Sequence, residues 1–172
     1  MAFLSIRVHP DPVLRVKCAT VETFDEGLER LAADMIQTMK AAPGVGLAAC
    51  QVGRDLRLAI VDPSGGEDAE ALHVLVNPEI VENRGRVIDD EGCLSIPGIT
   101  EKVARPSYVK IEAQDLEGKP FVLEGEELMA RVICHEVDHL NGVLFIDRLT
   151  GLRKEKVKRK IKRLARDQEA VG

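Results

Sequence analysis

The sequence has no apolar run that approaches the roughly 20 residues needed to cross a bilayer. Its first residues, Met1 to Cys18, include His9, Asp11 and two prolines in place of a continuous apolar segment, so they do not resemble a secretory signal. There is also no internal repeat, no linker and no low-complexity tract apart from a basic segment near the end. These absences predict a cytoplasmic protein without membrane contact, folded as a single domain over residues 1–172.

The cysteines form no CxxC pair and no disulfide-like framework; they are Cys18, Cys50, Cys93 and Cys134. In a reducing compartment such cysteines are free thiols or metal ligands. Three of them are expected to pack as small apolar side chains. The open question is which cysteine differs from the others. No role is predicted for Cys50.

Positive charge is concentrated in one part of a chain whose net charge is −5. Residues 153–166 hold nine lysines and arginines against one acid, Glu155, so this segment carries +8 and the remainder carries −13. Val157, Ile161 and Leu164 recur within it at helical spacing, which predicts a helix with one apolar stripe. Two interpretations stay open: a solvated amphipathic helix that keeps the chain soluble, or a docking element for a polyanion.

The first third of the chain predicts a helix followed by a strand. Thr23 and Glu26 have the spacing of a capping box, and leucines and methionines then recur every three or four residues. This helix should stop at Pro43-Gly44. Alternating apolar residues over 56–60 predict a half-buried strand. The sequence Pro63-Ser64-Gly65-Gly66 begins an acidic surface loop.

The rest of the chain predicts a hairpin between two further helices. A half-buried strand over 109–114 should pair with residues 121–123 across a turn at Glu117-Gly118. A second helix is expected over about 126–141, and a third over the basic segment. Helices at the two ends, with short strands between them, favour an α+β fold over alternating βαβ units.

The segment His135-Glu136-Val137-Asp138-His139 is the strongest local signal. Two histidines four residues apart on a helix face the same way and can bind one divalent metal. The glutamate between them is a candidate general base. Leu128 and Val132 fall on the histidine face of the same helix, so the metal would lie beside an apolar wall. We therefore expect short antiparallel strands around a central HExxH metal-binding helix.

A catalytic metal site needs a third protein ligand and keeps one position open. Downstream of His139 there is no histidine or cysteine, and Asp147 is the only plausible carboxylate. Upstream, the segment Glu91-Gly92-Cys93-Leu94-Ser95 offers a cysteine beside a glycine that lets the backbone approach closely. On the residues alone both candidates remain, and the Cys93 segment taken by itself fits a small buried side chain better than a metal ligand.

A third segment, GVGLAACQ at residues 44–51, carries a weaker signal. It lacks the third glycine of a dinucleotide fingerprint and the lysine of a P-loop, so phosphate binding is not expected. Its small residues suit close packing, or a strand edge that stays open to an extended ligand. Gln51 is a neutral amide donor, which is useful where negative charge develops on an oxygen.

In this order and at these separations, GVGLAACQ, EGCLS and HEVDHLNG resemble the three signature motifs of the peptide deformylases. The similarity extends from His9 to the end of the basic segment. The resemblance implies a metal hydrolase that removes the formyl group from the N-terminal methionine of nascent proteins and releases formate. The expected partners are N-formylmethionyl nascent peptides and, through residues 153–166, the ribosome.

The resemblance also implies a role for each site residue. The metal ligands would be Cys93, His135 and His139. Glu136 would move a proton from water to the departing amine, while Gln51 and the backbone N–H of Leu94 would stabilise the oxyanion. Substrate would contact Gly44, Val45, Gly46, Leu128 and Val132. An ion pair between Glu91 and Arg105 would brace the Cys93 loop.

The expected metal is Fe²⁺, by the resemblance, with Zn²⁺, Ni²⁺ or Co²⁺ possible in purified protein. Arg131, on the metal-binding helix, would point near the rim of the substrate pocket and influence side-chain preference.

Two other classes of protein fit parts of the sequence. An HExxH metalloprotease would apply the same metal chemistry to an internal peptide bond, but the missing downstream histidine and the upstream EGCLS segment count against it. A nucleic-acid-binding protein with a structural zinc would use residues 153–166 as a basic arm. A closed structural site wants a fourth protein ligand, however, and Glu136 would have no function there.

Overall fold

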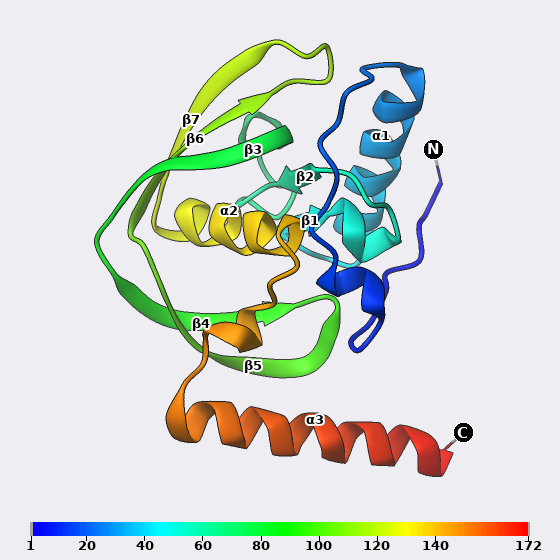
Figure 1. Ribbon diagram of the computed structural model, residues 1–172, viewed down its shortest axis with the longest axis vertical. Coiled ribbons are helices and arrows are strands. Elements are labelled where there is room, and N and C mark those ends of the chain that lie inside the picture. Colours follow the sequence, from blue (N-terminus) through cyan, green and yellow to red (C-terminus); the bar gives the residue numbers. More distant parts are fainter. Residues whose placement is uncertain (1, 172) are drawn as a thin grey trace.

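The computed structural model describes residues 2–171, which form α-helices, β-strands and short 3-10 helices (Figure 1). The α-helices are α1 (Glu26–Ala41), α2 (Glu127–Leu140) and α3 (Gly151–Val171). The strands are β1 (Gly46–Ala48), β2 (Leu58–Val61), β3 (His73–Arg84), β4 (Val87–Cys93), β5 (Ile96–Arg105), β6 (Tyr108–Gln114) and β7 (Pro120–Glu126). The 3-10 helices are η1 (Pro12–Arg15), η2 (Ala49–Val52), η3 (Ala69–Ala71) and η4 (Phe145–Arg148).

The strands form a five-stranded sheet in the order β1-β2-β3-β6-β7 and a separate hairpin of β4 and β5. Every strand pair is antiparallel, which confirms the predicted α+β class. The expected hairpin of 109–114 with 121–123 is present as β6 and β7. The expectation that all strands are short was wrong, because β3 has 12 residues and β5 has 10.

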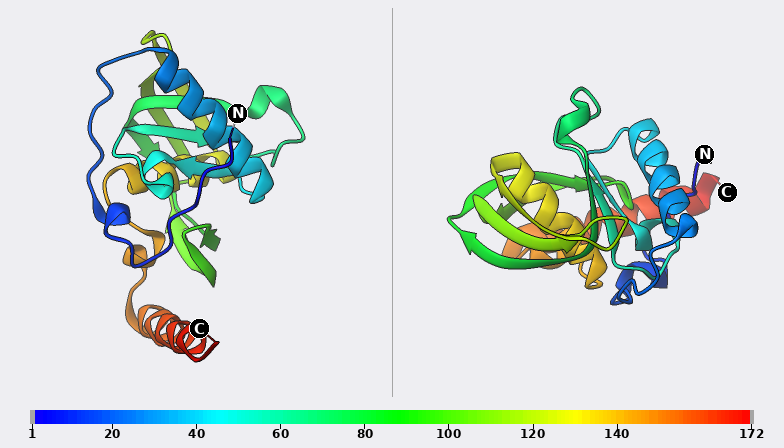
Figure 2. Two further views of the ribbon diagram at one scale, coloured as in Figure 1. Left: turned by 90° about the vertical axis from the view of Figure 1, so that its right-hand side faces the viewer. Right: turned by 90° about the horizontal axis from the view of Figure 1, so that it is seen from above.

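The long strands connect the two sheets by bending around α2. The chain passes from β3 to β4 at Gly85 and from β5 to β6 at Ser107, so both connections lie at the same corner (Figure 1). Gly85 has a φ of +73°, and a Cβ there would collide with the Ser107 side chain. The corner therefore requires glycine. As a result, α2 lies between the five-stranded sheet and the β4–β5 hairpin (Figure 2).

The two faces of the five-stranded sheet are covered by different helices. On one face, Leu28, Leu31 and Met35 of α1 pack with residues of β1 and β2. On the other face, Ile133 and Val137 of α2 pack with residues of β2, β3 and β6. All four residues of β2 are buried in consequence. The prediction of a half-buried strand was wrong there because alternation in sequence does not reveal that both faces are covered.

The predicted first helix is present, but its start is set by a different residue. The N-cap is Asp25, whose side chain accepts a hydrogen bond from the backbone N–H of Leu28 at 3.0 Å. Thr23 lies outside the helix, so the proposed capping box with Glu26 was wrong. Aspartate caps a helix as well as threonine does, and Asp25 stands immediately before the first turn. The helix ends at Ala41, before Pro43-Gly44 as expected.

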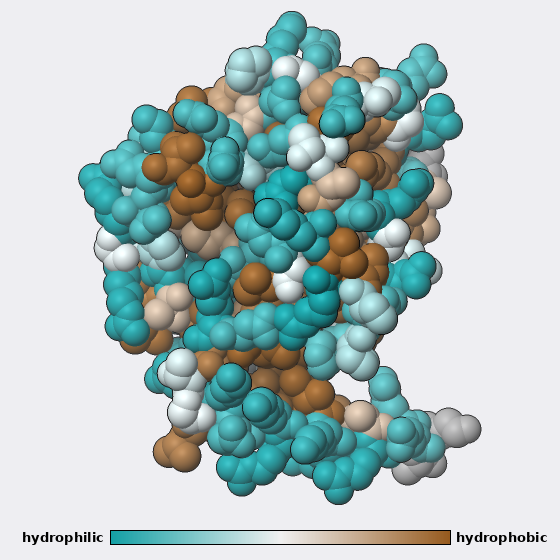
Figure 3. All heavy atoms as spheres, viewed as in Figure 1, coloured by the Kyte–Doolittle hydropathy of each residue, from teal (hydrophilic) through white to brown (hydrophobic). Residues whose placement is uncertain are grey.

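The basic segment lies within α3, which packs beside β5. Val157 is 4% exposed, and Ile161 and Leu164 pack against the same cluster as Ile99 and Val103. The Lys156 ammonium also lies 3.3 Å from the Glu101 carboxylate. Apolar side chains therefore lie between α3 and the rest of the molecule, while the outer face of α3 is polar (Figure 3). The predicted apolar stripe is thereby confirmed.

Among residues 2–171, no helix is both long enough and apolar enough to span a membrane.

Candidate metal centre and active site

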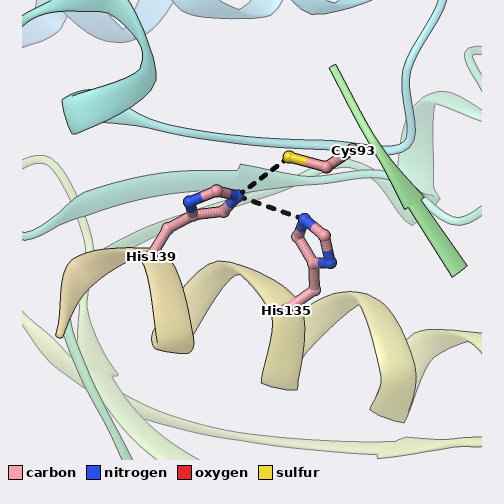
Figure 4. Close-up of side chains that lie close together, drawn as sticks. All are labelled: Cys93, His135 and His139. Atoms are coloured by element: carbon pink, nitrogen blue, oxygen red, sulfur yellow. Dashed lines mark hydrogen bonds between the residues drawn. The ribbon is translucent and has the colours of Figure 1, made fainter. Parts of the chain in front are cut away.

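Three potential metal ligands converge at the centre of the molecule. His135 and His139 project from the same face of α2, and Cys93 reaches them from the end of β4 (Figure 4). His139 Nε2 lies 3.1 Å from His135 Nε2 and 3.3 Å from Cys93 Sγ. All three donor atoms lie within 4.8 Å of one another. The i, i+4 spacing thus gives two ligands from one helix, and the sheet hairpin supplies the third.

This donor set fits a divalent transition metal. Tetrahedral coordination with bonds of about 2.0–2.3 Å spaces neighbouring ligand atoms by roughly 3.3–3.6 Å, so these three atoms need only small shifts to enclose one ion. A thiolate with two imidazoles suits zinc and iron alike. Three protein ligands leave a fourth position for water or substrate, as in catalytic sites.

The other candidate ligands lie elsewhere. Asp147, the downstream alternative, pairs with Arg15 and accepts a hydrogen bond from the backbone N–H of Leu144 at 2.9 Å. Cys18, Cys50 and Cys134 are buried free thiols, as expected for small core residues. Burial raises the pKa of Cys134 to about 11, which disfavours the thiolate that a metal needs.

Glu136 lies beside the three donors in a nearly closed environment. The residue is 3% exposed, and its Oε2 atom has no hydrogen-bond partner among the described residues. Burial raises the pKa of its carboxyl to about 7, although the neighbouring His135 acts in the opposite direction. A carboxyl with this pKa can both accept and release a proton near neutral pH, as a proton shuttle requires.

Glycine at position 46 makes room for that carboxylate. A Cβ atom added to Gly46 would lie 2.6 Å from Glu136 Oε1, which is far too close for a non-bonded contact. The first glycine of the segment is similarly restricted, because a Cβ at Gly44 would lie 2.9 Å from a methyl group of Leu94. The GVGLAACQ segment therefore needs its glycines for steric reasons, and no phosphate has to be invoked.

Glu91 orients the first histidine. Its Oε2 lies 2.7 Å from His135 Nδ1, and Arg105 donates two hydrogen bonds to the same carboxylate. The ion pair expected between Glu91 and Arg105 is thus present and buried. Burial alone would raise the pKa of Glu91, but the hydrogen bonds from His135 and Arg105 lower it to about 2. Because an ionised carboxylate only accepts, Nδ1 must carry the proton.

Their surroundings shift the pKa values of the two histidines in opposite directions. Burial would lower the pKa of His135, but contacts with Cys93 and Glu91 raise it to about 10. Burial and the adjacent charge on His135 hold the pKa of His139 well below its usual value. Positive charge is therefore stabilised beside Glu91, while His139 stays uncharged. This is the electrostatic environment that a bound cation requires.

Gln51 links the GVGLAACQ segment to the Cys93 loop. Its Oε1 accepts from the backbone N–H of Ala48 at 2.9 Å, and its Nε2 donates to Ser95 Oγ at 3.1 Å. The same nitrogen lies 3.7 Å from Cys93 Sγ. The amide is therefore fixed with one N–H toward Ser95 and its nitrogen beside the metal ligands. Ser95 was not singled out in the sequence, because a serine in a loop carries no distinctive signal.

A cavity of about 400 Å³ opens beside the donors. All the residues expected to contact substrate line it: Gly44, Val45, Gly46, Leu128 and Val132. Val45 and Leu128 are partly exposed at 38% and 50%, so an apolar side chain could cover them. β1, which includes Gly46, is an edge strand of the five-stranded sheet. Its outer edge can pair with an extended peptide.

Arg131 borders this cavity, but its guanidinium is not available to a ligand. Nη1 donates to Glu91 Oε1 at 3.1 Å and to the Val103 carbonyl at 2.9 Å, and Nη2 donates to the Val87 carbonyl at 3.0 Å. The residue is 8% exposed. The expected position beside the substrate cavity is therefore confirmed, while an influence of Arg131 on side-chain preference stays a prediction. Arg131 fastens both strands of the β4–β5 hairpin to α2.

Comparison with known proteins identifies the family. The polypeptide deformylase family model matches residues 3–155. A peptide deformylase of Clostridium botulinum is 54% identical over 150 residues, which cover 87% of this chain and 99% of the relative. A peptide deformylase of Chromobacterium violaceum is 47% identical over 163 residues, covering 95% and 96%. The crystal structure of a peptide deformylase from Legionella pneumophila superposes with a TM-score of 0.88 at 44% identity, covering 97% and 98%. The chain belongs to the polypeptide deformylase family.

Proposed function

We propose that this chain removes the formyl group of N-formylmethionyl peptides at a single divalent metal held by Cys93, His135 and His139. Family membership and the close relatives establish the deformylase activity itself. The observation that carries the residue assignment is the convergence of these three donors beside the Glu136 carboxylate, at the inner end of an apolar cavity. We further infer that residues 1–172 form one catalytic domain and that the protein acts in the cytoplasm.

A bound metal would act as a Lewis acid on the formyl oxygen and would lower the pKa of a water molecule. Glu136 takes a proton from the attacking water as its oxygen bonds to the formyl carbon. Glu136 then gives this proton to the amide nitrogen, the C–N bond breaks, and the products are formate and a free amino terminus. Its raised pKa and its buried position support both proton transfers.

The oxyanion that forms during the attack needs hydrogen-bond donors. We assign this role to the Gln51 side-chain amide and the backbone N–H of Leu94. Gln51 is already oriented by Ala48 and Ser95, so little reorganisation is needed when charge develops. Leu94 follows Cys93 directly in the chain and lines the same cavity, which supports this assignment.

The substrate side of the site is assigned to the small and apolar residues of the cavity. The methionine side chain would lie against Val45, Leu128 and Val132, and the peptide backbone would pair with the Gly44–Gly46 edge. An internal peptide would have to place bulky groups on both sides of its scissile bond. A formyl group places only a hydrogen there, which favours deformylation over proteolysis.

Substrate preference gives the first test. The protein should release formate from a formyl-methionyl peptide, and the acetyl analogue should react at least 10–200-fold more slowly, because an extra methyl group in a tight site costs about 1–3 kcal/mol. Formate release and free amine would be measured for the matched pair of peptides. Equal rates for the two, or cleavage of an unmodified internal bond, would instead indicate a protease.

The separate roles of Glu136 and Cys93 give the second test. Glu136→Gln should retain the metal but lose about 10²- to 10⁴-fold in kcat or more, because only the proton shuttle is removed. Cys93→Ala should weaken metal binding by more than the roughly 10–100-fold that is typical when a hydrogen-bond partner of a metal ligand is removed. Metal content and turnover would be measured on the same samples, with Cys134→Ala as a matched control that removes a buried thiol elsewhere. Full metal content in Cys93→Ala would show that the third ligand is wrong.

We propose ferrous iron as the native metal, as the resemblance to the family suggests, while zinc, nickel or cobalt could replace it in purified protein. The donor set accepts either iron or zinc, but only iron is redox-active. Protein prepared without oxygen should contain iron, be most active with it, and lose activity in air. Metal analysis and turnover would be followed before and after exposure to air. Highest activity with zinc, unaffected by oxygen, would contradict this choice.

We also propose that the outer face of α3 binds the ribosome. The apolar stripe of α3 faces the domain, so its exposed cations remain free to contact RNA phosphates. Such binding should weaken steeply with salt.

Charge neutralisation tests this more cleanly than truncation, because Val157 belongs to the core. One variant would carry glutamine at four exposed positions of α3: Lys158, Arg159, Lys162 and Arg163. The control would carry glutamine at four exposed basic positions elsewhere: Arg30, Lys40, Arg54 and Arg86. Only the α3 variant should lose co-sedimentation with ribosomes at low salt, and both should turn over short peptides normally. Equal sedimentation of the two variants would exclude the assignment.

A further inference from the structure

A continuous row of hydrogen bonds and ion pairs connects the metal ligand His135 to a half-exposed arginine. The row runs from His135 through Glu91, Arg105 and Asp138 to Arg148, the last residue of η4. Arg148 does not line the substrate cavity. Nothing in the HExxH pattern points to it, because it lies nine residues beyond the second histidine.

The inner part of the row has no spare hydrogen-bonding capacity. Each oxygen of Glu91 accepts two hydrogen bonds: Oε1 from Arg105 Nε and Arg131 Nη1, and Oε2 from Arg105 Nη2 and His135 Nδ1. These contacts range from 2.6 to 3.1 Å. A carboxylate with all four acceptor positions occupied has one orientation. That orientation decides where the proton on His135 Nδ1 points.

Arg105 couples this carboxylate to a second one. Its Nη1 donates to Asp138 Oδ2 at 2.7 Å, while its other two nitrogens, Nε and Nη2, donate to Glu91. Arg105 is 4% exposed, so its guanidinium has no solvent to replace a lost partner. Asp138 lies on α2 between the two metal-binding histidines. A shift of the Asp138 carboxylate would therefore move Arg105, and Arg105 would move Glu91.

Arg148 holds Asp138 from the outside with two hydrogen bonds. Nη2 donates to Oδ1 at 2.6 Å and Nε donates to Oδ2 at 3.1 Å, which is the two-pronged geometry that only arginine provides. The Arg148 side chain is 49% exposed, so as an isolated pair it would contribute little to stability. Its geometric effect is larger, because it fixes Asp138, the second carboxylate that Arg105 binds.

We propose that Arg148 is a positioning residue that acts through Asp138, Arg105 and Glu91 to fix the His135 imidazole toward the metal. The inference rests on the proposed metal site. With the Nδ1–H directed at Glu91, the Nε2 lone pair faces His139 and Cys93 and serves as the ligand. Loss of Arg148 loosens this arrangement without changing any group that contacts substrate. Arg131 continues to hold one oxygen of Glu91, so the loss is partial.

The test compares Arg148→Gln with Arg148→Lys and with a matched control, Arg15→Gln. Arg15 makes a similar two-pronged ion pair with Asp147, which also belongs to η4, but this pair does not lead to the metal site. Two quantities would be measured on zinc-loaded protein: the NMR signal of the His135 Nδ1–H proton, and zinc affinity by competition with a chelator. Turnover of a formyl-methionyl peptide would be measured as kcat and KM separately.

Arg148→Gln should shift and broaden the Nδ1–H signal, weaken zinc binding about three- to tenfold, and lower kcat by a similar factor with unchanged KM. This effect is at or below the roughly 10–100-fold loss of metal affinity or activity that is typical when a direct hydrogen-bond partner of a metal ligand is removed. Arg148→Lys should recover part of each effect, because lysine restores the charge but not the fork. Arg15→Gln should leave all of these values at wild-type levels.

The proposal is overturned if Arg148→Gln changes only the unfolding midpoint, as a purely structural ion pair would. It is also overturned if Arg15→Gln produces the same shift and the same loss of zinc affinity. If Arg148→Gln does not fold, the comparison of Arg148→Lys with Arg15→Gln decides between the same outcomes. Failure of the metal assignment itself would appear differently, as wild-type protein that binds no zinc.

Discussion

The carboxylate of Glu91 is the interaction on which the arrangement of the site depends. It lies at the point where the β4–β5 hairpin faces α2, and it binds an arginine from β5, an arginine from α2 and the first metal-binding histidine. Removing one partner from such a buried cluster typically costs about 3–5 kcal/mol, since a charge is then left unpaired. Replacing the whole cluster by apolar residues could be neutral for stability. Its value here is geometric, because it fixes the position of the hairpin that carries Cys93 relative to the helix that carries the two histidines.

The path of the backbone also holds the β4–β5 hairpin in place relative to α2. β3 continues into β4, and β5 continues into β6, so a single pair of bent ribbons encloses α2 (Figure 1). The helix that carries both histidines is therefore buried against a sheet on one side and a hairpin on the other. This enclosure explains why Glu136 and His139 are nearly inaccessible to solvent while the cavity beside them stays open. A base that must hold a proton near neutral pH needs this dry environment.

The proposed active site and the proposed docking surface lie on different sides of the β4–β5 hairpin. The apolar cavity lies between the edge strand β1 and the hairpin, where one backbone edge is unpaired and the flanking side chains are small. α3 packs against the other side of the hairpin and directs its cations outward. Ile99 contributes to both regions, because it lines the cavity and also belongs to the cluster beneath α3. The β4–β5 hairpin therefore borders the cavity on one side and contacts α3 on the other.

The sequence by itself determined the helix carrying His135, Glu136 and His139, the apolar stripe of α3 and the β6–β7 hairpin, because each depends on residues close together in the chain. It also singled out the segments that contain Gln51 and Cys93 as candidate parts of the active site. Only the tertiary structure brought Cys93, and not Asp147, beside the two histidines and showed β2 to be buried on both faces. It also revealed that Arg131, Asp138 and Arg148 continue the Glu91 cluster. These outcomes depend on which surfaces meet after the long strands bend around α2. Local periodicity and spacing carry no information about that contact, since its partners are 10 to 44 residues apart and individually resemble ordinary surface charges.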